Sequence, residues 1–168
     1  MIFVTVGTQL PFDRLIGAVD AWTAANPGAE VFAQIGPTSL EPRHVAYSNF
    51  ITPADCRERM ARATAVVAHA GMGTILSALE LGKPLLIVPR RASLGEHRNE
   101  HQLATARRFA ELGRVTVAFD DAELPAQLDA LDRIAAHAPI SPFASDRLIG
   151  AVRAFIGGEQ QQQQQRAA

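Results

Sequence analysis

The amino-acid sequence predicts an α/β fold, namely a Rossmann-like parallel sheet with helices on both faces. Short strand-like runs alternate with longer helix-like segments along the chain, which is the pattern of successive βα units. The runs at 65–68 and 85–88 are apolar without a polar alternation, as expected of strands that helices cover on both faces. Turns rich in glycine and proline separate many of these segments, so the alternation has clear boundaries.

Each element can be placed from its hydrophobic period and its flanking turn residues. Strands are expected at 2–6, 30–35, 65–68, 85–88 and 115–119, with one or two short extended pieces within 44–51. Helices are expected at 12–25, 54–63, 75–81, 100–112, 122–136 and 141–156. Asn26-Pro27-Gly28 ends the first helix, Thr52 or Asp55 starts the second, and Gly113 ends the fourth.

Length and composition indicate one soluble globular domain. The chain has 168 residues, of which 48% are hydrophobic and 20% charged, and its formal net charge is −1. This balance offers no basic surface for nucleic acid. The single cysteine, Cys56, excludes an internal disulfide and a cysteine-based metal cluster, and it is expected to be structural. No secretory signal precedes the first strand and the apolar runs are too short for a membrane span, so a cytoplasmic location is expected.

The last residues differ in composition from the rest of the chain. Residues 160–165 are six consecutive glutamines. A polar, low-complexity composition of this kind is typical of disordered segments. We therefore expect one folded domain over 1–157 and a disordered tail over 158–168, to which we assign no function.

A glycine turn between a buried strand and a helix is the first candidate for a binding site. The stretch His69-Ala70-Gly71-Met72-Gly73-Thr74 follows the strand at 65–68 and precedes a helical pattern. This arrangement directs free backbone N–H groups and the positive end of a helix at an anion. The turn lacks the third glycine of the dinucleotide fingerprint and the Lys-Ser/Thr ending of a P-loop. By itself, it is equally compatible with an ordinary strand-to-helix connection.

Two further loops leave the carboxyl ends of strands. Gly7-Thr8-Gln9 follows the first strand, and residues 89–102 follow the strand at 85–88. In parallel α/β sheets, ligands bind at the carboxyl ends of the strands. A phosphate cradle and a hydroxyl-binding loop at one edge together predict a nucleotide-sugar site. The residues of the second loop that can hold hydroxyls are Glu96, His97, Asn99, His101 and Gln102.

Several polar residues also allow simpler interpretations. His69 could cap a helix or fill the core, and Asp120-Asp121 stands at an expected helix start, where a capping role is favoured over metal binding. His97 and His101 are four residues apart, but their surroundings do not match the HExxH motif, so no metal is expected. Arg90-Arg91 either steers an anionic ligand, pairs with acidic residues of a partner, or is a solvated pair.

Six motifs follow one another in order within residues 1–117. They are Val4 to Gln9 with Pro11-Phe12-Asp13, Gln34-Ile35-Gly36, His69 to Thr74, Leu81 to Pro84, Val88-Pro89-Arg90, and Glu96-His97 through His101-Gln102. With these motifs the chain resembles glycosyltransferase family 28 C-terminal-domain proteins, and among them the small catalytic subunits of two-component UDP-sugar transferases. The fold that this resemblance implies is the donor-binding C-terminal half of a GT-B glycosyltransferase.

The resemblance implies roles for individual residues in binding the donor. His69 would contact a phosphate, and it is also the one candidate for a catalytic residue. The pair His101-Gln102 would hold sugar hydroxyls, with Glu96 as a further candidate on the same loop, and uracil would lie against Phe50-Ile51. The diphosphate would be held by backbone N–H groups and a hydroxyl of Gly7, Thr8, Gly71, Gly73 and Thr74.

One position departs from the family pattern. The lipid-II-forming member of the family carries a ribose-binding glutamate on the helix after the glycine turn. This chain has Ser77 at that position, and Glu80 lies three residues further along, nearly one helical turn away. A serine hydroxyl can bond one ribose hydroxyl, but it cannot clamp two as a carboxylate does. Ser77 is therefore expected to hold the ribose less firmly.

The function that the resemblance implies is that of a UDP-sugar-binding catalytic subunit of an inverting glycosyltransferase that needs no cofactor or bound metal. It would transfer a hexose of the GlcNAc, glucuronic acid or galactose type to a polyprenyl-diphosphate-linked sugar, in exopolysaccharide or lipid-linked oligosaccharide synthesis. A membrane-associated subunit would bind the acceptor, supply the general base and hold this chain at the cytoplasmic membrane face. Two alternatives are open: a non-catalytic subunit that enhances a membrane glycosyltransferase, and a UDP-sugar epimerase-like protein.

Overall fold

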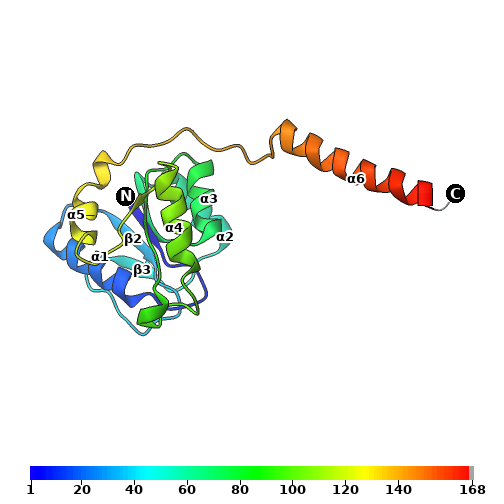
Figure 1. The fold of residues 1–168 in the computed structure, drawn as a ribbon. Helices are drawn as coiled ribbons and strands as arrows, with labels where there is room; N and C mark the ends of the chain where they lie inside the picture. Colours follow the sequence, from blue (N-terminus) through cyan, green and yellow to red (C-terminus); the bar gives the residue numbers. More distant parts are fainter. Residues whose placement is uncertain (167–168) are drawn as a thin grey trace.

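A computed structural model describes the backbone of residues 1–166 and the side chains of residues 1–157. Its centre is a six-stranded sheet in which all strand pairs are parallel, in the order β3-β2-β1-β4-β5-β6 (Figure 1). The predicted Rossmann-like parallel sheet is therefore confirmed. The strands are β1 (Ile2–Thr5), β2 (Val31–Gln34), β3 (Ala46–Ser48), β4 (Ala65–His69), β5 (Leu85–Val88) and β6 (Thr116–Val117).

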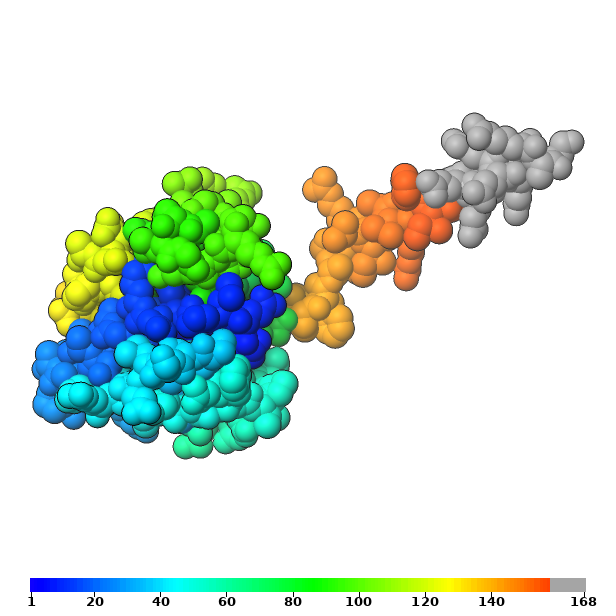
Figure 2. Space-filling view, turned by 90° about the horizontal axis from the view of Figure 1, so that it is seen from below, coloured from blue at the N-terminus to red at the C-terminus, as the bar shows by residue number. Residues whose placement is uncertain are grey.

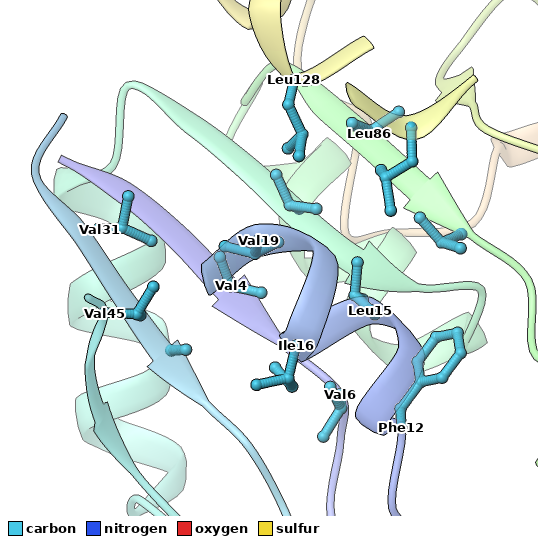
Figure 3. Close-up of a cluster of buried hydrophobic side chains, with 14 of the residues drawn as sticks. Val4, Val6, Phe12, Leu15, Ile16, Val19, Val31, Val45, Leu86 and Leu128 are labelled. Carbon is cyan, nitrogen blue, oxygen red and sulfur yellow. The ribbon is translucent and has the colours of Figure 1, made fainter. Parts of the chain in front are cut away.

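Helices cover both faces of this sheet, as predicted. The covering helices are α1 (Asp13–Ala25), α2 (Pro53–Arg62), α3 (Met72–Glu80), α4 (His101–Glu111) and α5 (Leu124–Asp129), and a further helix, α6 (Asp146–Arg166), follows them in the chain. Apolar side chains of α1 and α5 pack on one face of the sheet with Val4, and those of α2, α3 and α4 pack on the other face with Phe3. Figure 3 shows the first of these cores, where Leu15, Ile16 and Val19 of α1 surround Val4. Adjacent residues of β1 thus point into opposite cores.

The strand order creates a crevice at one edge of the sheet. β1 pairs with β2 on one side and with β4 on the other, so Ile2 lies in register with both Val31 and Ala65. The chain continues outward in opposite directions from β1 and β4, and the loops that follow these two strands therefore diverge. This is the switch point at which open parallel α/β sheets bind ligands.

The start of α2 shows how local sequence sets the boundary of an element. The Thr52 hydroxyl accepts a hydrogen bond from the backbone N–H of Asp55 at 3.1 Å, and Pro53 occupies the first turn. Such a cap satisfies an N–H that has no partner within the helix. The predicted helix start near Thr52 is thereby confirmed.

The structure corrects the elements predicted after β5. The helix expected at 122–136 ends at Asp129, and a 3-10 turn at Leu131–Arg133 follows it. A 3-10 turn has three residues per turn, so Leu131 and Ile134 both reach the first core. The strand expected at 115–119 is shorter, because only the two residues of β6 pair with β5.

The last helix begins at Asp146 rather than near Ser141. The Ser145 hydroxyl accepts a hydrogen bond from the N–H of Leu148 at 3.3 Å, whereas the Ser141 hydroxyl accepts one from Phe143 in a separate turn. Both serines are plausible caps, and the second one starts the helix. Figures 1 and 2 show α6 projecting from the rest of the molecule, which we call the body.

The backbone of α6 runs to Arg166 and crosses the boundary expected at residue 158. The division into a domain over 1–157 and a disordered tail over 158–168 stays a prediction, and residues 167–168 lie outside the described residues. Within the described part of the chain, no helix has both the length and the apolar character that a membrane crossing requires.

Candidate functional site

A cavity of about 370 Å³ opens at the switch point, beyond the carboxyl ends of β1, β4 and β5. Five of the predicted donor-binding residues line it, namely Gly7, Thr8, His69, Thr74 and Gln102. They belong to three segments that are far apart in the sequence, so the fold brings the three predicted loops to one place. The other residues that line this switch-point cavity are Thr5, Val6, Gln9, Leu10, Gln34, Ile51, Pro53, Cys56, Arg90 and His97.

The loop after β1 enters the cavity on a glycine. Gly7 has a φ of 75°, a left-handed conformation that glycine adopts without strain. Its N–H donates to the Thr5 hydroxyl at 3.2 Å, and that hydroxyl donates to Oε1 of Gln34 at 2.8 Å. Gln34 is 4% exposed and lines the cavity. Buried polar groups at the ends of β1 and β2 therefore support the backbone at Gly7 and Thr8.

His69 ends β4 and lies between two glycines. A Cβ at Gly7 would come within 2.9 Å of Cε1 of His69, and a Cβ at Gly71 would come within 2.1 Å of its Nε2. The imidazole thus occupies the space that larger residues at these positions would need. Its Nδ1 lies 3.4 Å from the carbonyl oxygen of Thr5. Burial, followed by the positive charge of Arg90, lowers the pKa of His69 to about 4.

The low pKa limits the chemistry that His69 can perform. In the ligand-free chain the ring is neutral at pH 7, so it offers a phosphate a hydrogen-bonding group rather than a fixed positive charge. A general base works best when its pKa lies near the operating pH, and a group with a pKa near 4 is a weak base there. This pKa supports a binding role for His69 more than the predicted catalytic one.

The glycine turn leads into the N-terminus of α3. In the first turn of a helix, the backbone N–H groups have no partner within the helix and carry a partial positive charge. Gly71 is the N-cap residue, and a Cβ at Gly73 would meet no atom within 4 Å. Open space therefore lies beside the backbone at Gly73, where an anion could approach. Thr74 adds a hydroxyl group that lines the cavity.

Glu96 has a different setting from the one expected. Its two carboxylate oxygens accept hydrogen bonds from Arg14 at 2.7 and 2.9 Å, and Oε2 also accepts one from the backbone N–H of Arg91 at 2.9 Å. Glu96 is not among the described residues that line the switch-point cavity. Its carboxylate connects the loop after β5 to α1. A contact between Glu96 and a donor sugar stays a prediction, and it would require this ion pair to open.

Ser77 lies on α3, one turn after Thr74, and is half-buried. It does not belong to the described lining of the cavity. The nearby Glu80 forms an ion pair with Arg57 of α2 at 3.6 Å, so that carboxylate supports helix packing. Ribose binding by Ser77 stays a prediction.

His101 is exposed at the start of α4 and also lies outside the described cavity lining. Its Nδ1 pairs with Oδ1 of Asn99, and its ring packs edge-on against His97 with 4.4 Å between the ring centres. His97 does line the cavity. The sugar contact predicted for His101 stays a prediction. Of the two histidines in this loop region, His97 is the one that lines the cavity.

Sequence reasoning did not assign Gln34 or Cys56 to the donor site, and it left Arg90 open between steering an anionic ligand, pairing with a partner and being solvated, although all three residues line the cavity. The available signal was a polar residue at the end of an apolar strand or within two residues after it. Gln34 ends β2 and Arg90 follows β5, and the carboxyl ends of parallel strands meet at one edge of the sheet. Of the predicted uracil-binding pair, Ile51 lines the cavity and Phe50 is 52% exposed.

The charges around the cavity favour an anion. The described residues that line the cavity include Arg90 but no Asp or Glu. The N-terminus of α3 adds a partial positive charge at the rim. No group of three or more His, Cys, Asp or Glu side chains in the described part of the chain is placed to hold a metal ion. The expectation of a metal-free site stays a prediction.

Known proteins similar to this chain agree with the fold and with the predicted family. The sequence model of the glycosyltransferase family 28 C-terminal domain matches residues 1–139. The UDP-N-acetylglucosamine transferase subunit ALG13 of Homo sapiens is 31% identical over 124 residues, which cover 68% of this chain and 10% of that protein. The chain thus spans about a tenth of the length of the curated relatives it matches.

Solved structures with the same fold include two that differ in size. The calicheamicin glycosyltransferase CalG4 aligns with a TM-score of 0.59 and 26% identity over 80% of this chain and 34% of that chain. The solution structure of ALG13 aligns with a TM-score of 0.55 and 22% identity over 90% of this chain and 93% of that chain, which shows the shared fold. The first alignment supports the predicted equivalence to one half of a GT-B glycosyltransferase. Because the family model covers most of its length, the chain belongs to the family of glycosyltransferase family 28 C-terminal domains.

Proposed function

We propose that this chain binds the UDP of a UDP-sugar in the switch-point cavity and acts as the catalytic subunit of an inverting glycosyltransferase. The observation that carries the proposal is the cavity between Gly7 and the N-terminus of α3, whose described lining residues include no Asp or Glu. A diphosphate in this position would meet the backbone N–H groups near Gly73 and the hydroxyl of Thr74. The uracil would lie against Ile51, which lines the same cavity and which also lines a neighbouring pocket together with Phe50.

In the proposed reaction, an acceptor hydroxyl oxygen forms a bond to the anomeric carbon while the bond from that carbon to the β-phosphate oxygen of UDP breaks. Attack from the face opposite UDP inverts the configuration. UDP leaves with increased negative charge, which fixed N–H donors stabilise more strongly in the transition state than in the ground state. The hydroxyl proton passes to a general base. Because His69 is a weak base, we assign this role to the partner subunit.

The names of the relatives support the choice of donor. The human and mouse relatives are UDP-N-acetylglucosamine transferase subunits, so UDP-GlcNAc is the first donor to test, followed by UDP-glucuronic acid and UDP-galactose. The proposed acceptor is a sugar carried on a polyprenyl diphosphate, as in exopolysaccharide or lipid-linked oligosaccharide synthesis. We expect the reaction to need no metal, and activity that persists in EDTA would agree with this.

The proposed partner is a membrane-associated subunit that binds the acceptor, and we propose that it docks on α6. Four apolar side chains of this helix are 48–67% exposed, and they follow one another at spacings of four, three and one residues. These spacings place them on one face of the helix, which we call the α6 apolar stripe. Helices with such a stripe bind in apolar grooves of other proteins. The stripe consists of Leu148, Val152, Phe155 and Ile156.

A partner subunit is the proposed occupant of this stripe because the curated relatives are themselves named as subunits. Docking through α6 would leave the switch-point cavity free for the donor, since α6 projects from the body (Figure 1). It would also hold the chain at the cytoplasmic face of the membrane, where a lipid-linked acceptor lies.

The first experiment is a calorimetric titration of UDP into the purified chain and into a Gly73→Asp variant. The carboxylate would repel the diphosphate and block the approach to the backbone, so we expect UDP affinity to fall by about tenfold or more. Gly150→Asp is the matched control, because a Cβ at either glycine meets no atom within 4 Å and both glycines lie in helices. This control should bind UDP like the natural chain.

Equal UDP binding by the natural chain and by folded Gly73→Asp protein would contradict the proposed site. If neither the chain nor its assembled pair with the partner binds UDP, the non-catalytic alternative replaces the proposed function. That alternative gains support from Ser77, which stands where a ribose-binding carboxylate is expected, and from the lack of a carboxylate base in the described lining of the cavity. Formation of an epimer from UDP-GlcNAc by the chain alone would instead indicate an epimerase.

A further inference from the structure

Arg90 lies two residues after the end of β5 and is 2% exposed, which is unusual for a charged side chain. It forms no ion pair with any carboxylate among the described residues. Its guanidinium instead donates hydrogen bonds to four backbone carbonyl oxygens. The partners are Val6 at 2.8 Å, Leu10 at 2.7 Å, Glu96 at 3.4 Å, and Pro11.

Three of these carbonyls belong to one loop, residues 6–11, which connects β1 to α1. This loop carries Gly7 and Thr8 into the switch-point cavity. Buried carbonyl groups need hydrogen-bond donors, and the planar guanidinium supplies several from one position. The group also lies over the ring of Phe12, 4.6 Å from its centre, at the end of the same loop. Arg90 therefore fixes this loop by hydrogen bonds near both of its ends.

The backbone of Arg90 orders a second wall of the cavity. Its N–H donates to Oε1 of Gln102 at 3.2 Å, and Gln102 is 4% exposed. Because this oxygen is engaged, the NH2 group is the part of the Gln102 side chain that can donate to a ligand. One residue thus sets the position of the first loop and the orientation of the amide on α4.

The charge of Arg90 also acts on the cavity that its side chain lines. Burial lowers the pKa of Arg90 to about 10, and the carboxylate of Glu96 offsets part of this effect, so the guanidinium stays charged at pH 7. A buried charge without a direct counter-ion is costly, and an anion bound nearby would compensate it. The cavity therefore carries a fixed positive charge that carbonyl bonds hold in place.

We propose that Arg90 is a positioning residue for the diphosphate of the donor: it holds the loop at 6–11 and the amide of Gln102 in place, and it supplies positive charge beneath the phosphate site. This inference rests on the proposed function of the cavity. Of the three roles that the sequence leaves open for Arg90-Arg91, the burial of Arg90 beside the cavity favours a role at an anionic ligand over a solvated pair or a bridge to a partner's acidic residues.

The test is to measure the affinities for uridine, UMP and UDP by calorimetry for the natural chain, Arg90→Lys and Arg90→Met. The natural chain should bind more tightly with each added phosphate. In Arg90→Met this gain should largely disappear, with an affinity for UDP that is lower by about tenfold or more and an affinity for uridine near that of the natural chain. Arg90→Lys keeps the charge but loses the planar fork, so its UDP affinity should lie between the two.

Arg91→Met is the matched control, since Arg91 is the adjacent arginine and lies outside the described cavity lining. It should retain the full gain from each phosphate. Backbone hydrogen exchange gives a second readout that needs no ligand. Amides of residues 7–10 should exchange faster in Arg90→Lys than in the natural chain, whereas Arg91→Met should leave their exchange unchanged.

The two proposals fail in different ways. If the natural chain binds UDP and folded Arg90→Met binds it equally well, the role of Arg90 is overturned and the function of the cavity is not. Equal losses of uridine and UDP affinity in Arg90→Met would also overturn it, because they would indicate general damage to the site. If neither the natural chain nor its assembled pair with the partner binds UDP, both proposals are overturned.

Discussion

The body of the molecule and α6 place apolar side chains in opposite environments. In the body, Leu86 and Ile75 are fully buried between the sheet and the helices that cover it. In α6, Phe155 is 67% exposed and Leu148 is 56% exposed. Both regions contain helices with apolar faces, but only the helices of the body have the sheet beside them. Figure 2 shows the described part of α6 standing clear of the body.

The difference separates stability from recognition. Burial of apolar area stabilises a fold in proportion to the area removed from water, so the buried residues of the body hold the free chain together. The α6 apolar stripe removes little area from water in the free chain, and it can release that free energy only when another protein covers it. The body in turn offers a different surface, a polar cavity with an arginine and no described acidic lining residue, which suits a small anion.

Truncation of an apolar side chain in each region, one buried and one exposed, would test the first half of this comparison. We expect Leu86→Ala to lower the free energy of unfolding by about 2–5 kcal/mol, because it leaves a cavity in the core. Leu148→Ala should change it by less than about 0.5 kcal/mol, since the side chain is exposed. Urea denaturation of both variants measures the two values. Similar losses would mean that α6 packs against the body in solution.

Charges placed on the α6 apolar stripe would test the second half. In Leu148→Asp/Phe155→Asp, we expect transferase activity of the assembled pair to fall by about 100-fold or more, because two buried anchors are lost. UDP affinity of the isolated chain should stay unchanged. Arg147→Ala/Arg153→Ala is the control, since these residues lie on the other side of the helix. Sedimentation that shows a dimer of the natural chain, dissociated by the aspartates, would identify a second copy as the occupant instead.

The imidazole of His69 makes the stability of the body depend on pH, because burial lowers its pKa in the folded chain. The pKa of His69 is about 4 in the fold and about 6.5 in the unfolded chain, so the unfolded state binds more protons between these values. We therefore expect the free energy of unfolding to fall by about 2–3 kcal/mol between pH 7 and pH 4.5 through this group. His69→Gln should reduce the slope of stability against pH, and the exposed His44→Gln should not. An unchanged slope in His69→Gln would show that the imidazole titrates normally.

The smallest expected effect concerns the ion pair that joins the loop after β5 to α1. Glu96→Gln weakens the two bonds to Arg14, and we expect a loss of about 1–2 kcal/mol in the free energy of unfolding. Affinities for UDP and for UDP-GlcNAc should both stay near those of the natural chain. A selective loss of UDP-GlcNAc affinity would show instead that Glu96 contacts the donor sugar, as the sequence predicts.

Local patterns predicted most of the body correctly because they depend on neighbouring residues. The apolar run at 65–68, the Thr52 cap and the glycine turn at 69–74 each carry their own structural signal. The structure has a strand and a helix start at the first two places. At the third, it has a short connection at residues 70–71, and α3 then begins at Met72 rather than at residue 75. The same reasoning was wrong for the last two helices. Ser141 and Ser145 are both suitable caps, and the apolar spacing after Asp129 suits an α-helix as well as a 3-10 turn.

The sequence by itself determined the alternation of strands and helices, and with it the three loops that meet at one edge of the sheet, because periodicity and turn chemistry act over a few residues. Only the tertiary structure decided what each charged group contacts. Arg14 and Glu96 are 82 residues apart, and Arg90 bonds to carbonyls about as distant from it. Such contacts depend on how the elements pack, so a sequence that shows an arginine pair and a polar loop does not show that Arg90 is buried or that Glu96 is engaged.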